Sequence, residues 1–178
     1  MITSLSTPVL QTTDLDFHHF ELADAPFLLR LMNQPSYHRF IGDRNLRSLS
    51  DMEDYLTQKI LPSYPNNGFG LYKLSLRQTH QAIGMFGLLS RPFLPAVDIG
   101  YVLLDEFSGK GYAFSAAQAL VQYATTVLHL PRLLAIVLPG NVRSIHLLKK
   151  LGFTFQGTFS LPSGEILEKH AKELAAIV

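Results

Sequence analysis

Two glycines, Gly109 and Gly111, separate a strand-like segment from a helix-like segment within residues 108–113 (SGKGYA). The first N–H groups of an α-helix have no carbonyl partner in their own helix, and this helix end carries a partial positive charge. Glycine has no Cβ, so an anion such as a diphosphate can approach the backbone closely. The segment is therefore typical of an anion-binding loop built from main-chain amides. A glycine-rich turn needed only for close packing is the alternative that this segment leaves open.

The loop differs from the two common nucleotide-binding motifs. The Walker A pattern, Gly-x-x-x-x-Gly-Lys-Ser/Thr, does not occur in the sequence. The dinucleotide fingerprint has glycine or alanine three residues after its second glycine, where this chain has Phe114. The sequence also lacks cysteine, a His-Glu-x-x-His pair among its seven histidines, and a Gly-x-Ser-x-Gly elbow. These absences argue against a metal site, a cysteine nucleophile and an α/β-hydrolase.

Hydrophobic periodicity predicts the elements that hold the loop. Two early helices are expected, one capped by Asp24 and one that starts at a capping box formed by Ser50 and Glu53, and residues 61–68 read as a loop. Strands joined by short connections then indicate an antiparallel meander, and the later alternation of helices and strands completes a mixed α/β domain with one sheet. The expected strands cover residues 72–76, 83–89, 97–104, 133–138, 153–159 and 166–174, and the later helices cover 113–128 and 142–151.

The composition is that of a globular protein with one domain, residues 1–178. Apolar residues make up 47% of the chain, and 15 Lys and Arg against 14 Asp and Glu give a net charge of +1. A charge so near zero argues against binding to nucleic acid phosphates. The longest uniformly apolar run, residues 133–138, is too short to cross a bilayer, and the first eight residues do not read as a signal peptide. We therefore expect a cytoplasmic protein with no membrane partner.

Three short motifs occur in a fixed order along the chain. They are residues 98–101 (DIGY), the glycine loop at 108–113, and residues 141–144 (NVRS) followed by 150–153 (KLGF). Together they resemble the GNAT N-acetyltransferase superfamily, and within it the RimJ/RimL-like branch of ribosomal-protein N-terminal acetyltransferases. The resemblance covers nearly the whole chain, although the loop departs from the family pattern Gln/Arg-x-x-Gly-x-Gly/Ala at its first position.

The resemblance implies a fold and a co-substrate. The fold is one mostly antiparallel sheet of about seven strands with a V-shaped splay, flanked by about four helices. The co-substrate is acetyl-CoA, with its pantetheine arm in the splay against the backbone of residues 102–104 and its diphosphate on the amides of the glycine loop. No metal is implied. The cofactor-binding residues expected on this basis are Val102, Leu103, Leu104, Gly109, Lys110, Gly111, Tyr112, Ala113, Asn141 and Ser144.

The resemblance also suggests the catalytic groups. Many members of the superfamily place a tyrosine acid where this chain has Leu148, so Ser144 becomes the candidate proton donor to the leaving sulfur. Capping of the helix after Asn141 is the alternative role of Ser144. Asp98 is the candidate base, acting through water, and an ion pair with a surface cation is its alternative. The analogy further places Tyr37, His38 and Tyr64 at the acceptor mouth.

The sequence thus predicts an N-acetyltransferase that moves an acetyl group from acetyl-CoA directly to an amine, with a protein N-terminal amine as one candidate acceptor. Two other acceptor classes, polyamines and small molecules such as amino acids or drugs, fit the sequence equally. A non-catalytic CoA-binding or regulatory domain on the same fold is the main rival, and a nucleotide-binding domain is another. We expect a monomer or a homodimer.

Overall fold

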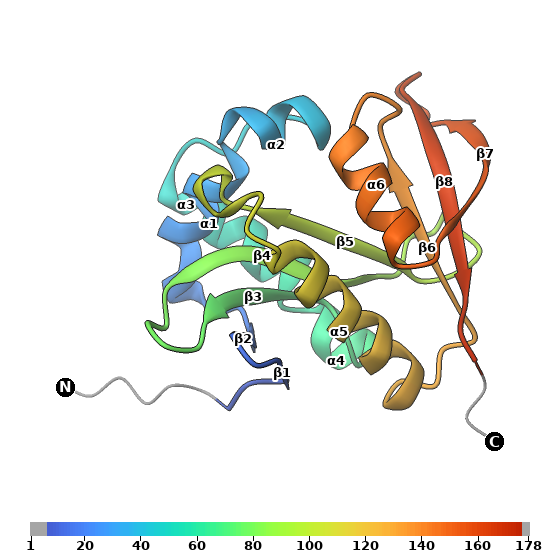
Figure 1. Ribbon diagram of the computed structural model, residues 1–178. Helices are drawn as coiled ribbons and strands as arrows, with labels where there is room; N and C mark the ends of the chain where they lie inside the picture. The colour runs from blue at the N-terminus through green and yellow to red at the C-terminus, as the bar shows by residue number, and fades with distance from the viewer. Residues whose placement is uncertain (1–6, 176–178) are drawn as a thin grey trace.

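One twisted sheet forms the centre of the molecule (Figure 1). The computed structural model describes residues 7–175, and within them the sheet has eight strands in the order β1-β2-β3-β4-β5-β6-β8-β7. All neighbouring strands are antiparallel except β5 and β6, which are parallel. The strands are β1 (Leu10–Gln11), β2 (Leu15–His19), β3 (Leu71–Leu76), β4 (Ala82–Leu89), β5 (Asp98–Leu103), β6 (Arg132–Val137), β7 (Thr154–Ser160) and β8 (Ile166–Glu173).

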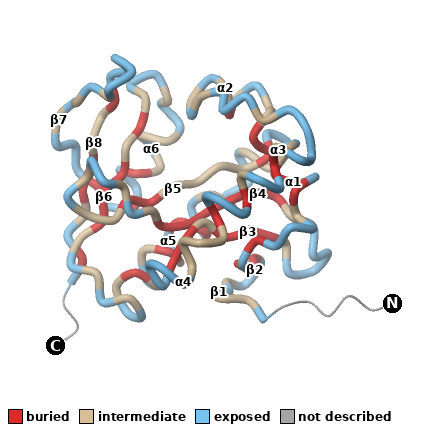
Figure 2. The backbone as a smooth tube through the Cα atoms, turned by 180° about the vertical axis from the view of Figure 1, so that it is seen from behind, coloured by how far each residue is buried: buried red, intermediate tan, exposed pale blue. Residues whose placement is uncertain are grey.

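Helices cover the sheet on both faces, and the buried residues concentrate in the strands between them (Figures 1 and 2). One apolar cluster joins the sheet to α5 and α6, and a second joins it to α1, α2 and α3. The helices are α1 (Ala25–Met32), α2 (Pro35–Phe40), α3 (Leu49–Tyr55), α4 (Ser63–Asn67), α5 (Tyr112–Thr126) and α6 (Val142–Lys150). Short 3₁₀ turns, η1 (Leu22–Asp24) and η3 (Asp105–Phe107), and a π-helical turn, η2 (Leu56–Ile60), complete the set.

The predicted V-shaped splay lies between β5 and β6. Strand β5 pairs with β4 along its whole length, whereas it pairs with β6 only at Asp98 and Leu134. Beyond that pair the two strands diverge. The Leu104 N–H donates to the Ile83 carbonyl at 2.8 Å. Because main-chain direction alternates along an antiparallel pair, the backbone groups of Tyr101 and Leu103 face the gap toward β6.

Most of the predicted elements are confirmed within one or two residues. The sheet has eight strands, where the resemblance implied about seven. The six strands predicted from the sequence are all present, and β1 and β2 had not been predicted. The predicted capping box is wrong: Ser48 and Asp51 form it, with the Asp51 N–H donating to Ser48 Oγ at 3.1 Å. The predicted loop at 61–68 contains α4, and α2 had not been identified. Residues 1–6, which belong to the segment examined for a signal peptide, lie outside the described residues.

Asp24 precedes α1 as predicted, but its carboxylate does not cap that helix. Asp24 Oδ2 accepts from the Glu21 N–H at 2.9 Å, and Oδ1 lies 2.7 Å from Lys73 Nζ. Asp24 therefore closes the η1 turn and ties it to β3.

Candidate active site

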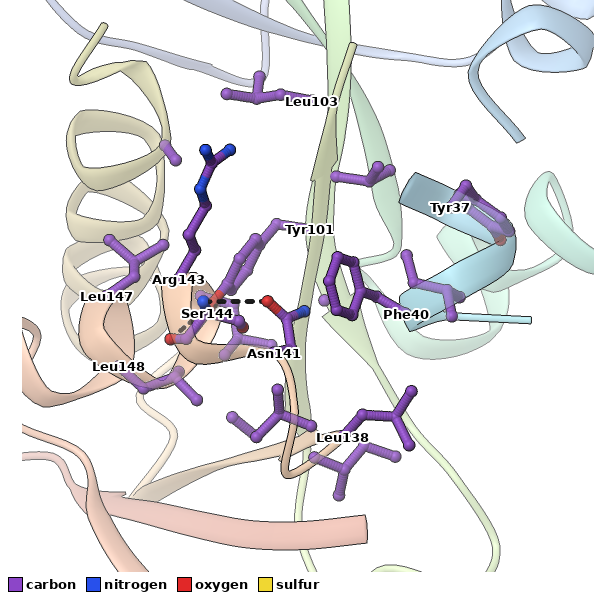
Figure 3. A pocket seen from close by; sticks show the side chains of 18 of the residues that line it. Tyr37, Phe40, Tyr101, Leu103, Leu138, Asn141, Arg143, Ser144, Leu147 and Leu148 are labelled. Atoms are coloured by element: carbon purple, nitrogen blue, oxygen red, sulfur yellow. Dashed lines mark hydrogen bonds between the residues drawn. The ribbon is translucent and has the colours of Figure 1, made fainter. Parts of the chain in front are cut away.

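A cavity of about 730 Å³ opens where β5 and β6 diverge, and α2 and α6 lie on its two sides (Figure 3). The structure brings most of the sequence-predicted residues together around it. Leu104, Lys110 and Tyr112 are the exceptions among those predictions, since none of the three lines the cavity within the described part of the chain. The predicted residues that line it are Asp98, Val102, Leu103, Gly109, Gly111, Ala113, Asn141 and Ser144.

The glycine loop leads directly into α5. Gly109 has φ +76° and Gly111 has φ +84°, a left-handed conformation that favours glycine. A Cβ at either position would meet none of the described heavy atoms within 4 Å. The glycines therefore serve the backbone conformation and leave open space above it, and the close-packing interpretation is wrong. Lys110 Nζ lies over the Phe107 ring, 5.1 Å from its centroid.

The first turn of α5 presents its N–H groups beside this open space. The Ser115 N–H donates to the Gly111 carbonyl at 3.2 Å, which is the first bond of the helix. The N–H groups before it have no carbonyl within their own helix, and they carry the positive end of the helix dipole. The loop and helix start thus form a cradle suited to a diphosphate.

The exposed edge of β5 continues this cradle into the sheet. The carbonyl of Leu103 accepts from Gln34 Nε2 at 2.8 Å, while Gln34 Oε1 accepts from the Asp105 N–H at 3.0 Å. Gln34 thereby fixes the end of β5. Of the predicted run 102–104, only the backbone of Leu103 faces the gap, and Tyr101 provides the other main-chain groups on this edge. An extended chain with amide groups can bind there as an added strand.

Tyr101 and Ser144 form a hydroxyl pair at the centre of the cavity. Their oxygens lie 2.6 Å apart and share a hydrogen bond, and the Ser144 N–H donates to Asn141 Oδ1 at 3.2 Å (Figure 3). The Tyr101 ring stacks on Phe86 with centroids 5.5 Å apart. Burial raises the pKa of Tyr101 to about 12, although its bond to Ser144 acts in the opposite direction. Tyr101 is therefore neutral at physiological pH, and either of the two hydroxyls can be the donor of the bond between them.

Tyr101 is not among the functional residues predicted from the sequence. Its place in the DIGY motif could have pointed to it. Successive residues along β5 face opposite sides of the sheet, and Tyr101 lies on the side that α5 and α6 cover. Asn141 is confirmed as the cap of α6. Leu148 is buried against the main core, as an aliphatic side chain requires.

Asp98 lies at the other end of β5 and does not meet Ser144. Its carboxylate is 1% exposed, and both oxygens accept from Arg91 Nε, at 3.0 and 3.1 Å. Burial raises the pKa of Asp98 to about 6, while the Arg91 guanidinium acts to lower it. The ion-pair interpretation of Asp98 thus has a direct geometric basis.

The α2 side of the cavity carries aromatic residues. Tyr37 lines the cavity, as predicted, and Phe40 lies beside it across from Asn141 and Ser144 (Figure 3). Tyr64 lies elsewhere: its hydroxyl accepts from the Phe20 N–H at 3.0 Å and donates to the Leu71 carbonyl at 2.5 Å. His38 points to Asp43, with Nε2 and Oδ1 3.7 Å apart. The placement of Tyr64 and His38 at the acceptor mouth is therefore wrong.

Within residues 7–175 no group of three or more His, Cys, Asp or Glu side chains is arranged to hold a metal ion. Over the same residues, none of the helices combines the length and apolar character needed to span a membrane.

Comparison with known proteins identifies the family. Residues 14–154 match the family model described as an acetyltransferase (GNAT) domain. The chain is 30% identical over 150 residues to the uncharacterized N-acetyltransferase p20 of Bacillus licheniformis, a match that spans 83% of each chain. The structure resembles that of the acetyltransferase from Agrobacterium tumefaciens str. C58, with TM-score 0.79 and 27% identity over 95% of this chain and 96% of that one.

A further solved structure contains a ligand. It is RimL, a ribosomal L7/L12 α-N-protein acetyltransferase in complex with coenzyme A, with TM-score 0.77 and 17% identity over 96% of this chain and all of that one. At 17% identity this likeness shows the common fold, and the RimJ/RimL-like branch stays a prediction. The family match, the p20 relative and the splayed sheet agree with one another, and the chain belongs to the GNAT acetyltransferase family.

Proposed function

We propose that this chain uses acetyl-CoA and transfers its acetyl group directly to an amine. The observation that carries the proposal is the free edge of β5, which ends at an open glycine loop and passes the Tyr101–Ser144 pair. The residues present fit the group: the main chain of Tyr101 and the N–H of Leu103 offer partners for pantetheine amides, whereas the Leu103 carbonyl already accepts from Gln34. The amides from Gly109 to Ala113 offer partners for a diphosphate. Acetyl-CoA supplies the acetyl group and a thiol leaving group when it is bound.

The reaction makes two demands on protons. A bond forms between the amine nitrogen and the acetyl carbon, the carbon–sulfur bond breaks, the nitrogen loses a proton and the sulfur gains one. A thiol has a pKa of roughly 8.5 and a terminal amine one of roughly 7.7–8.0, so neither demand is large near neutral pH. Holding the two reactants in one cleft supplies much of the acceleration.

Ser144 meets the demand at sulfur. We assign it the hydrogen bond to the leaving sulfur, at the N-terminal end of α6 where the helix dipole favours negative charge. Either hydroxyl of the Tyr101–Ser144 pair can be the donor. We assign the donor role to the Tyr101 phenol, which leaves the serine proton free to point into the cavity, so Tyr101 orients the serine. Tyr101 thus acts on the reaction through Ser144 and is a positioning residue.

Asp98 has two candidate roles, as a base acting through water and as the partner of Arg91. The two contacts from Arg91 Nε favour the second role. A base is not essential when the acceptor amine has a pKa near neutrality, because a fraction of it is already unprotonated. A protein N-terminal amine, the acceptor of the RimJ/RimL-like branch, meets this condition.

The rival function is a domain that binds CoA without catalysis, and Leu148 in place of the tyrosine acid favours it. The deciding experiment measures thiol release from acetyl-CoA, with mass analysis of the product, against a panel of peptides and small amines. Acetylation of any amine above the rate without protein supports the proposal. Thermal stabilisation by acetyl-CoA without acetylation of any acceptor supports the rival. Stabilisation by ATP or NAD but not by acetyl-CoA would overturn both.

A further inference from the structure

The cavity passes through the plane of the sheet, and its two sides differ in chemistry. Tyr101 and Ser144 lie on the side of α5 and α6, together with the glycine loop. On the opposite face, Asp98 and Val102 of β5 point toward the helices α1–α3. Since the cradle for the diphosphate belongs to the α5 side, the α1–α3 side is the part of the cavity that an acceptor amine can enter.

Two arginines stand on this acceptor side. Arg44, in the segment after α2, lies with its guanidinium carbon 5.7 Å from the centre of the Tyr55 ring, and its Nε donates to the Tyr37 hydroxyl at 3.4 Å. Arg91 binds Asp98 and lies 6.0 Å from the centre of the Phe93 ring. Burial raises the pKa of Tyr55, while the positive charges of Arg44 and Arg91 act to lower it.

The charges of the two arginines are unequally compensated. Asp98 neutralises Arg91, whereas none of the salt bridges among residues 7–175 includes Arg44. Asp43, the sequence neighbour of Arg44, pairs with Arg47 instead. Of the other acidic residues that line the cavity, Asp105 lies at the α5 end and Glu165 is exposed in the turn between β7 and β8. The net charge around Tyr37 and Tyr55 is therefore positive.

A polyamine is a poor occupant of such a site. After its first amine reaches the thioester, its remaining ammonium groups would approach Arg44 and Arg91, and like charges at these positions repel. A carboxylate suits this site better, because its charge is opposite to that of the arginines. Among residues 7–175 only Nε of Arg44 makes a hydrogen bond, so its terminal nitrogens can bind a carboxylate in the two-pronged manner typical of arginine. The Tyr55 ring lies beside the guanidinium, with its centre 5.7 Å from the guanidinium carbon.

We propose that the acceptor of this acetyltransferase carries a carboxylate in addition to its amine, and that Arg44 binds this carboxylate beside Tyr37 and Tyr55. The proposal rests on the N-acetyltransferase function above and narrows its acceptor class. Two sources supply the same chemistry: a small amino acid whose amine and carboxylate are well separated, and a protein N-terminus with an acidic residue close to its first position. In both sources the amine and the carboxylate are farther apart than in a simple α-amino acid, because Arg44 follows α2 and Ser144 belongs to α6, on opposite sides of the cavity.

The test compares three acceptors of one length, namely 6-aminohexanoate, hexylamine and 1,6-diaminohexane. A second arm uses pentapeptides with a free N-terminus and Glu, Gln or Lys as the second residue. The wild-type protein is expected to show kcat/KM about tenfold higher for the carboxylate acceptor than for its cationic counterpart in one arm or both. Attraction of the carboxylate to Arg44 and repulsion of the second cation both contribute to this difference, and tenfold corresponds to about 1.4 kcal/mol. The arm with the larger preference identifies the source. Raising the salt concentration should reduce the preference, since Arg44 is exposed to solvent.

Arg44→Gln is the deciding variant, and Arg39→Gln is its matched control because Arg39 is an exposed arginine of α2 that lies over Phe40 without lining the cavity. Arg44→Gln should lower kcat/KM for the carboxylate acceptor about tenfold and leave that for hexylamine within twofold. Arg39→Gln should change neither. A wild-type preference for the diamine and the Lys peptide, or equal losses on all acceptors in Arg44→Gln, would overturn the proposal. Failure of every amine to be acetylated would instead contradict the proposed function.

Discussion

The hydroxyl oxygens of Tyr101 and Ser144 lie 2.6 Å apart and connect the splayed strand β5 to the first turn of α6. The two residues are 43 positions apart in the sequence. Their contact places a neutral phenol next to a serine hydroxyl, in the part of the cavity that is lined by residues of β5, α6 and α2 (Figure 3).

Ser144→Ala and Tyr101→Phe should both lower turnover, and their effects should not add. Loss of a hydrogen bond to a charge-developing atom costs about 1.5–3 kcal/mol, so kcat for Ser144→Ala should fall on the order of 10–100-fold while acetyl-CoA binding barely changes. Tyr101→Phe keeps the ring on Phe86 and should cost about tenfold. In the double variant Tyr101→Phe should add little, because it acts through Ser144. Additive losses, or a lower melting temperature with normal kcat in Ser144→Ala, would contradict the assignment.

Gly111→Glu should abolish acetyl-CoA binding without unfolding the protein. The new carboxylate would stand in the open space above the loop and repel a diphosphate. Gly68→Glu is the matched control, because Gly68 also has a left-handed backbone, φ +75°, with open space around it, but caps α4 away from the cavity. Both variants should lose similar stability from backbone strain, and only Gly111→Glu should lose thermal stabilisation by acetyl-CoA. Equal stabilisation of the two variants would show that the loop does not hold the diphosphate.

Asn141→Ser should retain the cap of α6 and still impair the enzyme. Serine caps a helix nearly as well as asparagine, so the melting temperature should fall by little. The shorter side chain cannot replace the Asn141 amide in the cavity, and kcat/KM should fall. Asn141→Asp keeps the acceptor for the Ser144 N–H and loses the amide donor, so it should impair activity as well. Full turnover in both variants would mean that capping is the whole role of Asn141.

Asp98 should make the stability of the protein depend on pH between about 4 and 6. The pKa of Asp98 in the folded protein is about 6, against an ordinary value of 3.8 for this side chain, so the folded state holds this proton to higher pH than the unfolded state does. The Asp98 proton therefore stabilises the folded state fully below about pH 4, and this stabilisation is lost as the pH rises through 6. The free energy of unfolding should fall by about 3 kcal/mol over this range. Chemical denaturation across this range measures it.

Asp98→Asn should remove that pH dependence, and Asp54→Asn, at an exposed position of α3, should not. The same variants separate the two roles of Asp98. If Asp98 only holds Arg91, the pH profile of kcat/KM in Asp98→Asn keeps its shape. Disappearance of an acidic limb near pH 6, with a large loss of rate, would instead identify Asp98 as the base.

The parts of the fold that the sequence predicted are those with a strong local period. Tyr72 and Leu74 alternate with Lys73 and Ser75 in β3, and the apolar stripe of α5 repeats at helical spacing. Strand β2 was not predicted because its polar residues Asp16 and His18 are buried as well as Leu15 and Phe17, so the strand shows no alternation of polar and apolar residues that matches burial. The strand forms because it pairs with β3, and a local sequence pattern cannot reveal a pairing between segments more than fifty residues apart.

Local rules also fail where two patterns compete. Ser48 with Asp51 and Ser50 with Glu53 both have capping-box spacing, and only the hydrogen bonds distinguish them. The candidate site shows the same limit. The glycines were visible in the sequence, but their left-handed conformation and open surroundings were not. The Tyr101–Ser144 contact depends on where α6 is set against the splayed strand, which is a tertiary relationship.

The single register pair between β5 and β6 makes their junction the place where the sheet is expected to separate most easily. Hydrogen bonds between strands hold β1–β5 together as one half of the sheet and β6–β8 as the other, while the junction depends on Asp98 with Leu134, the Val97 carbonyl and the packed side chains beneath. Such a seam is where sub-global opening is expected to be easiest. A ligand that pairs with the free edge of β5 would fill the seam between β5 and β6 and hold the two halves of the sheet together. Amide hydrogen exchange in β6, β8 and α6 should therefore slow on acetyl-CoA binding, well beyond the residues that the ligand touches, whereas exchange in β2 and β3 should change little.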